Sequence, residues 1–362
     1  MTNKEYWFWL CNLEGIGIKK IQLLLDYFGS PEEVYKDRGK GLEEIKQLTI
    51  SDKETILNSK NQKRIGENYA KLAEKGIYFV TKEEDRYPKR LHNIYNPPFC
   101  LYVKGSLPIE DKVSIAIVGS RNCSAYGRET AKFFAAELAK NGVQIISGLA
   151  RGIDGYAHEG ALLAEGSTYA VEGCSVDICY PKENFNLYLN MQTKGGVISE
   201  YGLNCYPKPW NFPMRNRLIS GLSDGILVIE AKEKSGSLIT ADMGLDQGKN
   251  IYSIPGRITD VLSTGCNNLI KMGAKLVTGP EEILEDYGIN YKICKKYVKK
   301  NDKYLETKEK IVYAVLSFLP KHMNEIAGET NLSIMELTEI LTQLELKNYI
   351  RQVGKNYYEC IL

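Results

Sequence analysis

A short glycine turn carries residues whose types suit phosphate binding. Gly119, Ser120 and Arg121 follow an apolar run, Ile115 to Val118, and precede a helix-like segment. A strand, a glycine turn and a helix N-terminus direct backbone N–H groups and the positive end of the helix dipole at one place, where an anion is favoured. Arg121 adds a planar cation that can hold a phosphate through two oxygens. The pattern predicts an anion site, and the alternative is a tight turn that binds no ligand.

The spacing of this turn differs from that of a dinucleotide-binding motif. A GxGxxG pattern has three glycines, whereas Gly119 is followed by Ser-Arg-Asn-Cys. A Walker lysine pattern is also absent, and the three histidines have no nucleophile or metal-ligand partners nearby in the sequence. We therefore predict no cofactor and no metal, and a protein that binds its ligand without catalysis.

Further cations and hydroxyls follow other predicted strands. Ligands of open α/β sheets bind outside the carboxyl ends of the strands. We therefore expect these side chains, with Arg257, on one rim, where cations track a polynucleotide backbone and aromatic faces stack on unpaired bases. For Arg217 the alternative is an internal ion pair with Glu230 or Asp224, and for Trp210 and Phe212 it is packing. The residues predicted to contact the polynucleotide are Gly119, Ser120, Arg121, Ser147, Gly148, Arg151, Lys182, Phe185, Arg215, Asn216, Arg217, Ser235, Gly236 and Ser237.

The elements that must position these residues form a repeating pattern. Between residues 113 and 288 a short apolar run, a glycine-bearing turn and a helical stretch recur. Strands that alternate with helices predict an α/β fold with an extended, Rossmann-like, doubly wound and mostly parallel sheet. The helix after the first turn has Ser124 as its predicted N-cap and an apolar face of Ala131, Phe134, Ala135 and Leu138. The strands are expected at 115–118, 143–146, 168–171, 197–199, 226–229, 251–254 and 275–277.

A small helical domain is expected before the sheet, over residues 1–76. The Gly15-Ile16-Gly17 turn leads into Lys19, Lys20 and a periodic apolar face, which is typical of a helix-hairpin-helix whose backbone amides meet a phosphate. An ordinary helical packing unit is the alternative. The sheet domain follows over 77–288, beginning with strands in a proline-punctuated lead-in.

Two further segments are predicted after the sheet. Residues 289–305 are rich in lysine and form an expected linker. Residues 306–362 carry helical periodicity, a capping box at Ser333 and Glu336, and a hairpin around Gly354, which together predict a winged helix. Its would-be recognition helix is acidic, so we predict that it contacts a protein rather than duplex DNA.

Composition sets broad limits on the function. The 362 residues carry a net charge of +2, so binding of nucleic acid requires a local basic patch. Nine scattered cysteines without a CxxC pair favour reduced thiols over disulfides or a zinc site. No apolar run reaches 18 residues, so we expect a soluble, cytoplasmic protein.

Six motifs occur in order along the central region. They are Gly119-Ser120-Arg121, the segment 147–154, Ser199-Glu200, Arg215-Asn216-Arg217, the segment 235–241 and Pro255-Gly256. Their combination closely resembles the DNA-processing protein A family, also called DprA or Smf. The resemblance spans nearly the whole chain, because family members can carry a helical N-terminal domain of the SAM or helix-hairpin-helix type, an extended Rossmann domain and a C-terminal winged helix (DML1-like).

The resemblance implies a function and partners. Family members are cytoplasmic proteins that bind single-stranded DNA, protect incoming DNA in natural transformation and hand it to the RecA recombinase. They work as homodimers that associate through the Rossmann domain, and they do not bind a membrane. Carried over by position, the DNA pocket uses the Gly119 and Gly148 turns, Lys182, Phe185 and the segment 215–217. The alternatives are a nucleotide phosphoribohydrolase, which needs an acid where Asp242 stands, and a nucleotide sensor.

Overall fold

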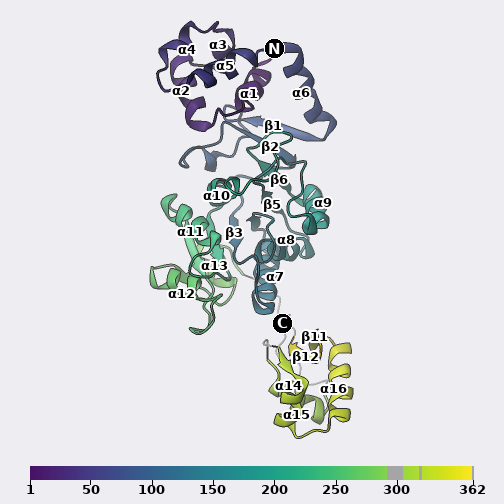
Figure 1. The fold of residues 1–362 in the computed structure, drawn as a ribbon. Helices are drawn as coiled ribbons and strands as arrows, with labels where there is room; N and C mark the ends of the chain where they lie inside the picture. The colour runs from purple at the N-terminus through teal and green to yellow at the C-terminus, as the bar shows by residue number, and fades with distance from the viewer. Residues whose placement is uncertain (292–304, 318–319, 361–362) are drawn as a thin grey trace. The chain divides into compact units, whose positions relative to one another are not determined.

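The computed structural model describes residues 1–291, 305–317 and 320–360 (Figure 1). The chain forms two compact units, Met1–Cys123 with Ala131–Ile289 and Ser124–Thr130 with Asn290–Leu362. Most of the lysine-rich segment predicted at 289–305 lies outside the described residues. The domain boundaries drawn from the sequence at 76/77, 288/289 and 305/306 stay predictions.

Helices make up the first 76 residues. Two of them begin with a capping box, formed by Thr2 with Glu5 and by Thr49 with Asp52. In each box the side chain of one residue accepts a hydrogen bond from the backbone N–H of the other, and these N–H groups have no partner within the helix. The core of this region includes Trp7 and Leu10, which are almost fully buried. The helices are α1 (Asn3–Cys11), α2 (Ile18–Phe28), α3 (Pro31–Lys36), α4 (Lys40–Glu44), α5 (Ile50–Asn58) and α6 (Gln62–Glu74).

A nine-stranded sheet follows, in the order β1-β2-β6-β5-β4-β3-β7-β8-β9. All neighbouring pairs from β6 to β9 are parallel, and β2 is antiparallel to both of its neighbours. This confirms the predicted doubly wound, mostly parallel sheet. The strands are β1 (Ile77–Thr81), β2 (Cys100–Gly105), β3 (Ser114–Val118), β4 (Gln144–Ser147), β5 (Thr168–Val171), β6 (Gly196–Ser199), β7 (Gly225–Val228), β8 (Asn250–Ser253) and β9 (Lys275–Leu276).

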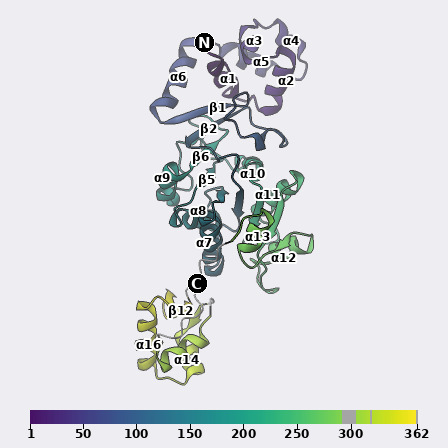
Figure 2. The ribbon, with the colours of Figure 1, turned by 180° about the vertical axis from the view of Figure 1, so that it is seen from behind.

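Helices cover both faces of the sheet, one set on each side (Figures 1 and 2). The chain runs from β3 outward to β6 in one direction and from β7 outward to β9 in the other, so the strand order reverses between β3 and β7. Right-handed crossovers then place the two sets of helices on opposite faces. One face carries α7 (Ala125–Lys140), α8 (Ile153–Leu163) and α9 (Phe185–Lys194), and the other carries α10 (Asn211–Gly221), α11 (Gly236–Asp246) and α12 (Thr264–Lys271). Helix α13 (Glu281–Asp286) follows β9, and its Asp286 accepts a hydrogen bond from the Tyr252 hydroxyl of β8 at 3.0 Å.

Helix α7 confirms the apolar periodicity expected of it. Its four predicted core residues are each at most 2% exposed, and the Ser124 Oγ accepts a hydrogen bond from the Gly127 N–H at 3.0 Å, as an N-cap does. Burial is equally complete along β3, where all five residues are buried. Such all-round burial explains why the strands are apolar runs rather than alternating sequences.

The C-terminal unit contains the predicted winged helix. Ser333 and Glu336 form the expected capping box, and a three-stranded sheet in the order β10-β12-β11 carries the hairpin. Phe318, expected in the first helix, lies outside the described residues. None of the helices in the described ranges is long and apolar enough to cross a membrane. The elements are α14 (Thr307–Val315), β10 (Lys321–His322), α15 (Met323–Thr330), α16 (Ile334–Leu346), β11 (Ile350–Gly354) and β12 (Tyr357–Cys360).

Gly152 provides a test of how tightly the strand-end turns are packed. It has a φ of +75°, and a Cβ there would lie 2.3 Å from the Ser120 carbonyl oxygen. We expect Gly152→Ala to lower the free energy of unfolding by about 2–4 kcal/mol, through backbone strain and steric clash. Gly248→Ala is the matched control, because its φ is +70° but no atom lies within 4 Å of the added Cβ. Its expected loss in urea unfolding is about 1 kcal/mol, and equal losses would contradict the packing argument.

Candidate functional site

A groove lies at the carboxyl ends of β3 and β7, where the strand order reverses. Ligands of doubly wound sheets bind at this topological switch point. The groove has a volume of about 550 Å³. Eight residues predicted from the sequence line it, and Tyr180, Phe212, Lys232 and Lys234 line it with them. We call it the β3–β7 groove; the eight are Gly119, Ser120, Arg121, Arg215, Asn216, Ser235, Gly236 and Ser237.

The glycine turn after β3 is anchored to its neighbours. A Cβ on Gly119 would lie 2.7 Å from the Ile153 side chain and 2.9 Å from the Glu230 carbonyl oxygen, so the close approach requires glycine. The Ser120 N–H donates to that same carbonyl at 2.7 Å. The expectation that this turn offers its amides to an anion is therefore wrong for Ser120, whose N–H already has an internal acceptor.

Two arginines lie close to one aromatic ring in the wall of the groove. The Arg121 guanidinium lies 5.7 Å from the centroid of Phe212, and the Arg215 guanidinium lies 5.9 Å from it. Tyr180 packs against the same ring, with centroids 5.4 Å apart and planes tilted by 32°. Cation–π attraction holds guanidinium groups near aromatic faces at such distances. Arg121 and Tyr180 are exposed, so a cation and an aromatic face are both open to solvent at this rim.

Arg215 lines the groove with a side chain that is almost fully buried and bonded to the backbone. It is 3% exposed, and its Nη1 donates to the carbonyl oxygens of Gly148, at 2.9 Å, and Val171. A Cβ on Gly148 would lie 2.7 Å from this guanidinium, which explains the glycine. Ser147 is fully buried, and its Oγ donates to the Ile117 carbonyl at 2.7 Å. Ser147 and Gly148 therefore support the groove from below and do not line it.

Two predicted DNA-binding arginines are paired with carboxylates. Arg217 is 4% exposed and bonds Glu200, which is neither of the two partners considered from the sequence. Arg151 forms an exposed ion pair with Glu183. Neither arginine lines the β3–β7 groove, so the structure does not gather all the strand-end cations in one place.

Lys182 and Phe185 lie outside the groove, at the 3₁₀ turn Lys182–Asn184 and the start of α9. Both are exposed, and the Phe185 ring stacks on Tyr188 at 6.2 Å with an interplanar angle of 21°. Arg257 is exposed and also lies outside the groove.

Sequence analysis missed two lysines in the groove. Lys232 and Lys234 are exposed and line it just before the Ser235 turn. The rule that ligands meet the carboxyl ends of strands was sufficient to find them, because they follow β7 by four and six residues. Neither they nor Arg121 form an ion pair within the part of the chain that the structure describes.

Buried titratable groups surround Arg215. Burial raises the pKa of Glu172 to about 8, although the Arg215 charge opposes this shift. Burial also raises the pKa of Asp154, whose carboxylate accepts the Gly148 N–H at 3.1 Å. Burial and the Arg215 charge lower the pKa of His158 to about 3, and its Nδ1 lies 2.7 Å from the Thr168 hydroxyl. In the described residues, no group of three or more His, Cys, Asp or Glu side chains is arranged to hold a metal ion.

Comparison with known protein families shows to which family the chain belongs. The family described as DNA recombination-mediator protein A matches residues 78–288. The chain belongs to the DNA-processing protein A family. The DprA winged helix domain matches residues 301–355, which agrees with the C-terminal unit. The Bacillus subtilis DNA processing protein DprA is 40% identical over 218 residues, covering 60% of this chain and 73% of that protein.

Other DprA and Smf proteins are similar to the chain. Protein Smf of Escherichia coli is 40% identical over 247 residues, covering 67% of this chain and 66% of that protein. The structure of DprA from Streptococcus pneumoniae superposes with a TM-score of 0.69 and 34% identity, covering 81% of this chain and 99% of that one. The structure of DNA processing protein A from Helicobacter pylori, described for its single-stranded DNA binding mode, has a TM-score of 0.54 and 31% identity, covering 59% and 97% of the two chains.

The protonation of Glu172 predicts a pH dependence of stability. Its pKa lies near 8 in the folded protein against 4.5 for a free side chain, so the folded state binds this proton more tightly. The free energy of unfolding therefore falls as the pH rises from 4.5 through about 8. Glu172→Gln removes this loss, so its melting temperature relative to the unchanged chain is expected to increase from pH 5 to pH 9. Glu183→Gln, at an exposed carboxylate, is the control and should show no such trend; a Glu172 variant that grows less stable toward pH 9 would oppose the assignment.

Proposed function

We propose that the chain binds single-stranded DNA in the β3–β7 groove without catalysis, protects incoming DNA in natural transformation and loads the RecA recombinase. The observation that carries the binding proposal is the meeting of exposed Arg121, Lys232 and Lys234 with the aromatic pair Tyr180 and Phe212 in one groove. Lys182 and Phe185, also exposed, are proposed as contacts for a strand that continues beyond the groove.

The chemistry of the groove favours an unpaired strand. Cations attract the phosphate backbone, and binding releases the counterions of the DNA. Aromatic faces stack on bases only where the bases are not already paired, and each stacked base contributes roughly 1–3 kcal/mol. The single-stranded DNA binding described for the Helicobacter pylori relative supports the same choice.

The scarcity of carboxylates in the β3–β7 groove supports a binding role without catalysis. Asp154 is the one carboxylate among the lining residues that the structure describes, and it is buried and bonded to the Gly148 N–H. Asp242, where a phosphoribohydrolase needs its acid, is exposed and does not line the groove. The observation therefore favours a binding protein over the hydrolase, and a nucleotide sensor remains the second candidate because the groove suits a phosphate.

Homodimerisation through the Rossmann domain is part of the proposal. Leu276 of the edge strand β9 exposes 42% of its side chain, and Leu245 and Met272, which line one pocket together with Lys275 of β9, expose 52% and 73%. Exposed apolar side chains that cluster at a sheet edge suit a protein interface. Loading of RecA rests on the family resemblance, and the cytoplasm is the proposed location.

Charge reversal in the groove tests DNA binding. We expect Arg121→Glu and Lys234→Glu each to weaken binding of a labelled oligo-dT by about tenfold or more and to reduce the steepness of its salt dependence. Lys194→Glu, an exposed cation of α9 that does not line the groove, is the matched control. Fluorescence anisotropy at several salt concentrations measures both effects. An equal loss with Lys194→Glu, or release of a base from a nucleoside monophosphate, would reject the proposal.

The winged helix is proposed to contact a protein. Its helix α16 carries Glu336, which pairs with Lys308 at 2.8 Å, while Lys347 at its end is bound to Glu309 at 2.6 Å. The positive charge at this end of the helix is therefore neutralised. Met335 and Leu346 expose 84% and 79% of their side chains on the same helix, which suits a protein partner better than a phosphate backbone.

Isolation of this domain tests the assignment. Fragment 306–362 is expected to show no micromolar affinity for duplex DNA at physiological salt, because its would-be recognition helix repels phosphate. The full chain, titrated in parallel with the same duplex and with oligo-dT, controls for active protein. Micromolar binding of the duplex by the fragment would show that the acidic helix does read DNA.

A further inference from the structure

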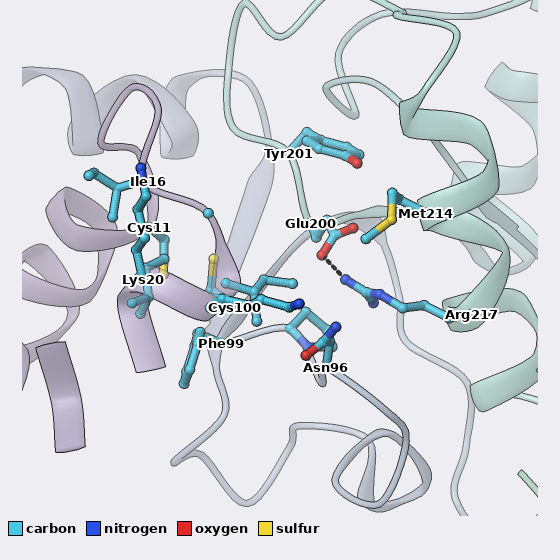
Figure 3. Close-up of a pocket in the computed structure, with 15 residues that line it drawn as sticks. Cys11, Ile16, Lys20, Asn96, Phe99, Cys100, Glu200, Tyr201, Met214 and Arg217 are labelled. Atoms are coloured by element: carbon cyan, nitrogen blue, oxygen red, sulfur yellow. Dashed lines mark hydrogen bonds and ion pairs between the residues drawn. The ribbon is translucent and has the colours of Figure 1, made fainter. Parts of the chain in front are cut away.

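A second cavity lies where the N-terminal helices meet the sheet, within one compact unit of the chain. Its volume is about 520 Å³. It is lined by the start of α2, the segment before β2, the residues after β6 and one side of α10 (Figure 3). We call it the helix–sheet cavity.

Buried Arg217 lines this cavity and has two hydrogen-bond donors without a partner. One of its nitrogens bonds Glu200, but its Nε and Nη1 have no hydrogen-bond partner. The side chain is 4% exposed, and Figure 3 shows it extending toward Glu200 and Asn96. Buried donors without acceptors are costly, so a ligand that carries an acceptor would be bound here with a favourable free energy.

The walls around this polar floor are apolar and partly aromatic. Ile16 and Phe99 are 4% and 6% exposed, and Tyr201 and Met214 lie across the cavity from them (Figure 3). Apolar walls with a few convergent polar groups are the usual make-up of a small-ligand pocket. The combination fits a flat ring with a polar edge.

The start of α2 adds an anion-binding element at the same cavity. This 11-residue helix has Gly17 as its N-cap with no side-chain cap, so its first N–H groups and dipole are open to a ligand. Lys19 is exposed and lines the cavity. Lys20 bonds Asp52 at 2.6 Å and the Gly15 carbonyl at 3.3 Å, which holds the turn in place.

Helix α10 joins this cavity to the β3–β7 groove. Arg215 and Asn216 line the groove, whereas Met214 and Arg217 line the helix–sheet cavity. Adjacent side chains of one helix therefore serve two cavities. A polynucleotide that follows this helix would meet both.

We propose that the helix–sheet cavity binds a nucleobase, with the base edge at Arg217 and Glu200 and the attached phosphate at the N-terminus of α2. The base needs an acceptor for the free donors of Arg217 and a donor for the Glu200 carboxylate, and the edges of nucleobases carry both. The base comes either from a strand that already lies in the groove, a source that rests on the proposed function, or from a free nucleotide.

Filling the cavity mouth tests the proposal without disturbing the buried ion pair. Gly17 has a φ of −85° and no atom within 4 Å of an added Cβ, so Gly17→Tyr is expected to fold. We expect it to weaken binding of a 30-nucleotide oligo-dT by about 5- to 150-fold, the range for one stacked base, and to leave binding of a 6-mer unchanged. Lys19→Glu should act in the same direction. Lys46→Glu, an exposed lysine of the same helical region that does not line the cavity, is the matched control and should change neither.

Calorimetry with deoxynucleoside monophosphates distinguishes the two sources. Saturable binding that Gly17→Tyr abolishes identifies a free nucleotide, whereas a loss confined to the long oligonucleotide identifies the strand. If Gly17→Tyr and Lys19→Glu alter neither measurement while the unchanged chain binds both oligonucleotides, the proposal is wrong and the cavity serves another ligand. If the unchanged chain binds no oligonucleotide, the proposed function fails instead, and the monophosphate titration alone decides on the cavity.

Discussion

The buried guanidinium of Arg215 is the contact on which the candidate site depends. It joins α10 to the carbonyl oxygens that follow β4 and end β5, and it lies against the Phe212 ring that forms the groove wall. A charged group is tolerated at 3% exposure only because carbonyl dipoles, Glu172 and Asp154 surround it. Its charge lowers the pKa of Glu172, Asp154 and His158, although burial has the larger effect on each of them. The groove is therefore held from beneath by a cation that is itself barely exposed.

Two kinds of basic residue emerge at the strand ends. Arg215 and Arg217 are buried and bonded internally, so they organise the chain, whereas Arg121, Lys232 and Lys234 are exposed and line the groove. The planar guanidinium of a buried arginine is fixed by the hydrogen bonds that its donors make, whereas the ammonium group of an exposed lysine is strongly hydrated and available to a ligand. This division explains how a chain of net charge +2 can present a locally basic surface. It also leaves two donors of Arg217 without partners, which is why the helix–sheet cavity can be argued as a second site.

Much of the fold was predictable because buried strands and helix faces have recognisable patterns of apolar residues in the sequence. All seven predicted strands of the central region exist within a residue or so of their expected positions. Six of them are largely buried on both faces and are therefore apolar runs, whereas both residues of β9 are exposed. The Ser333 capping box and the α7 face were also predictable, because each depends on residues three or four apart. Both strands of the lead-in join the sheet, with β1 at its edge and β2 inside it.

By itself, the sequence determined the order of the elements along the chain and the placement of Gly119 to Arg121 and of Ser235 to Ser237 after predicted strands, whereas the strand order that brings β3 beside β7 is known only from the structure. The order and the placement follow from local periodicity and from the rule that parallel strands end on one side of the sheet. Only the tertiary structure decided which cations remain available, because the pairing of Arg217 with Glu200, of Arg151 with Glu183 and of the Ser120 N–H with the Glu230 carbonyl joins residues far apart in the chain. Side-chain burial and long-range pairing depend on distances in space, which residue spacing does not encode.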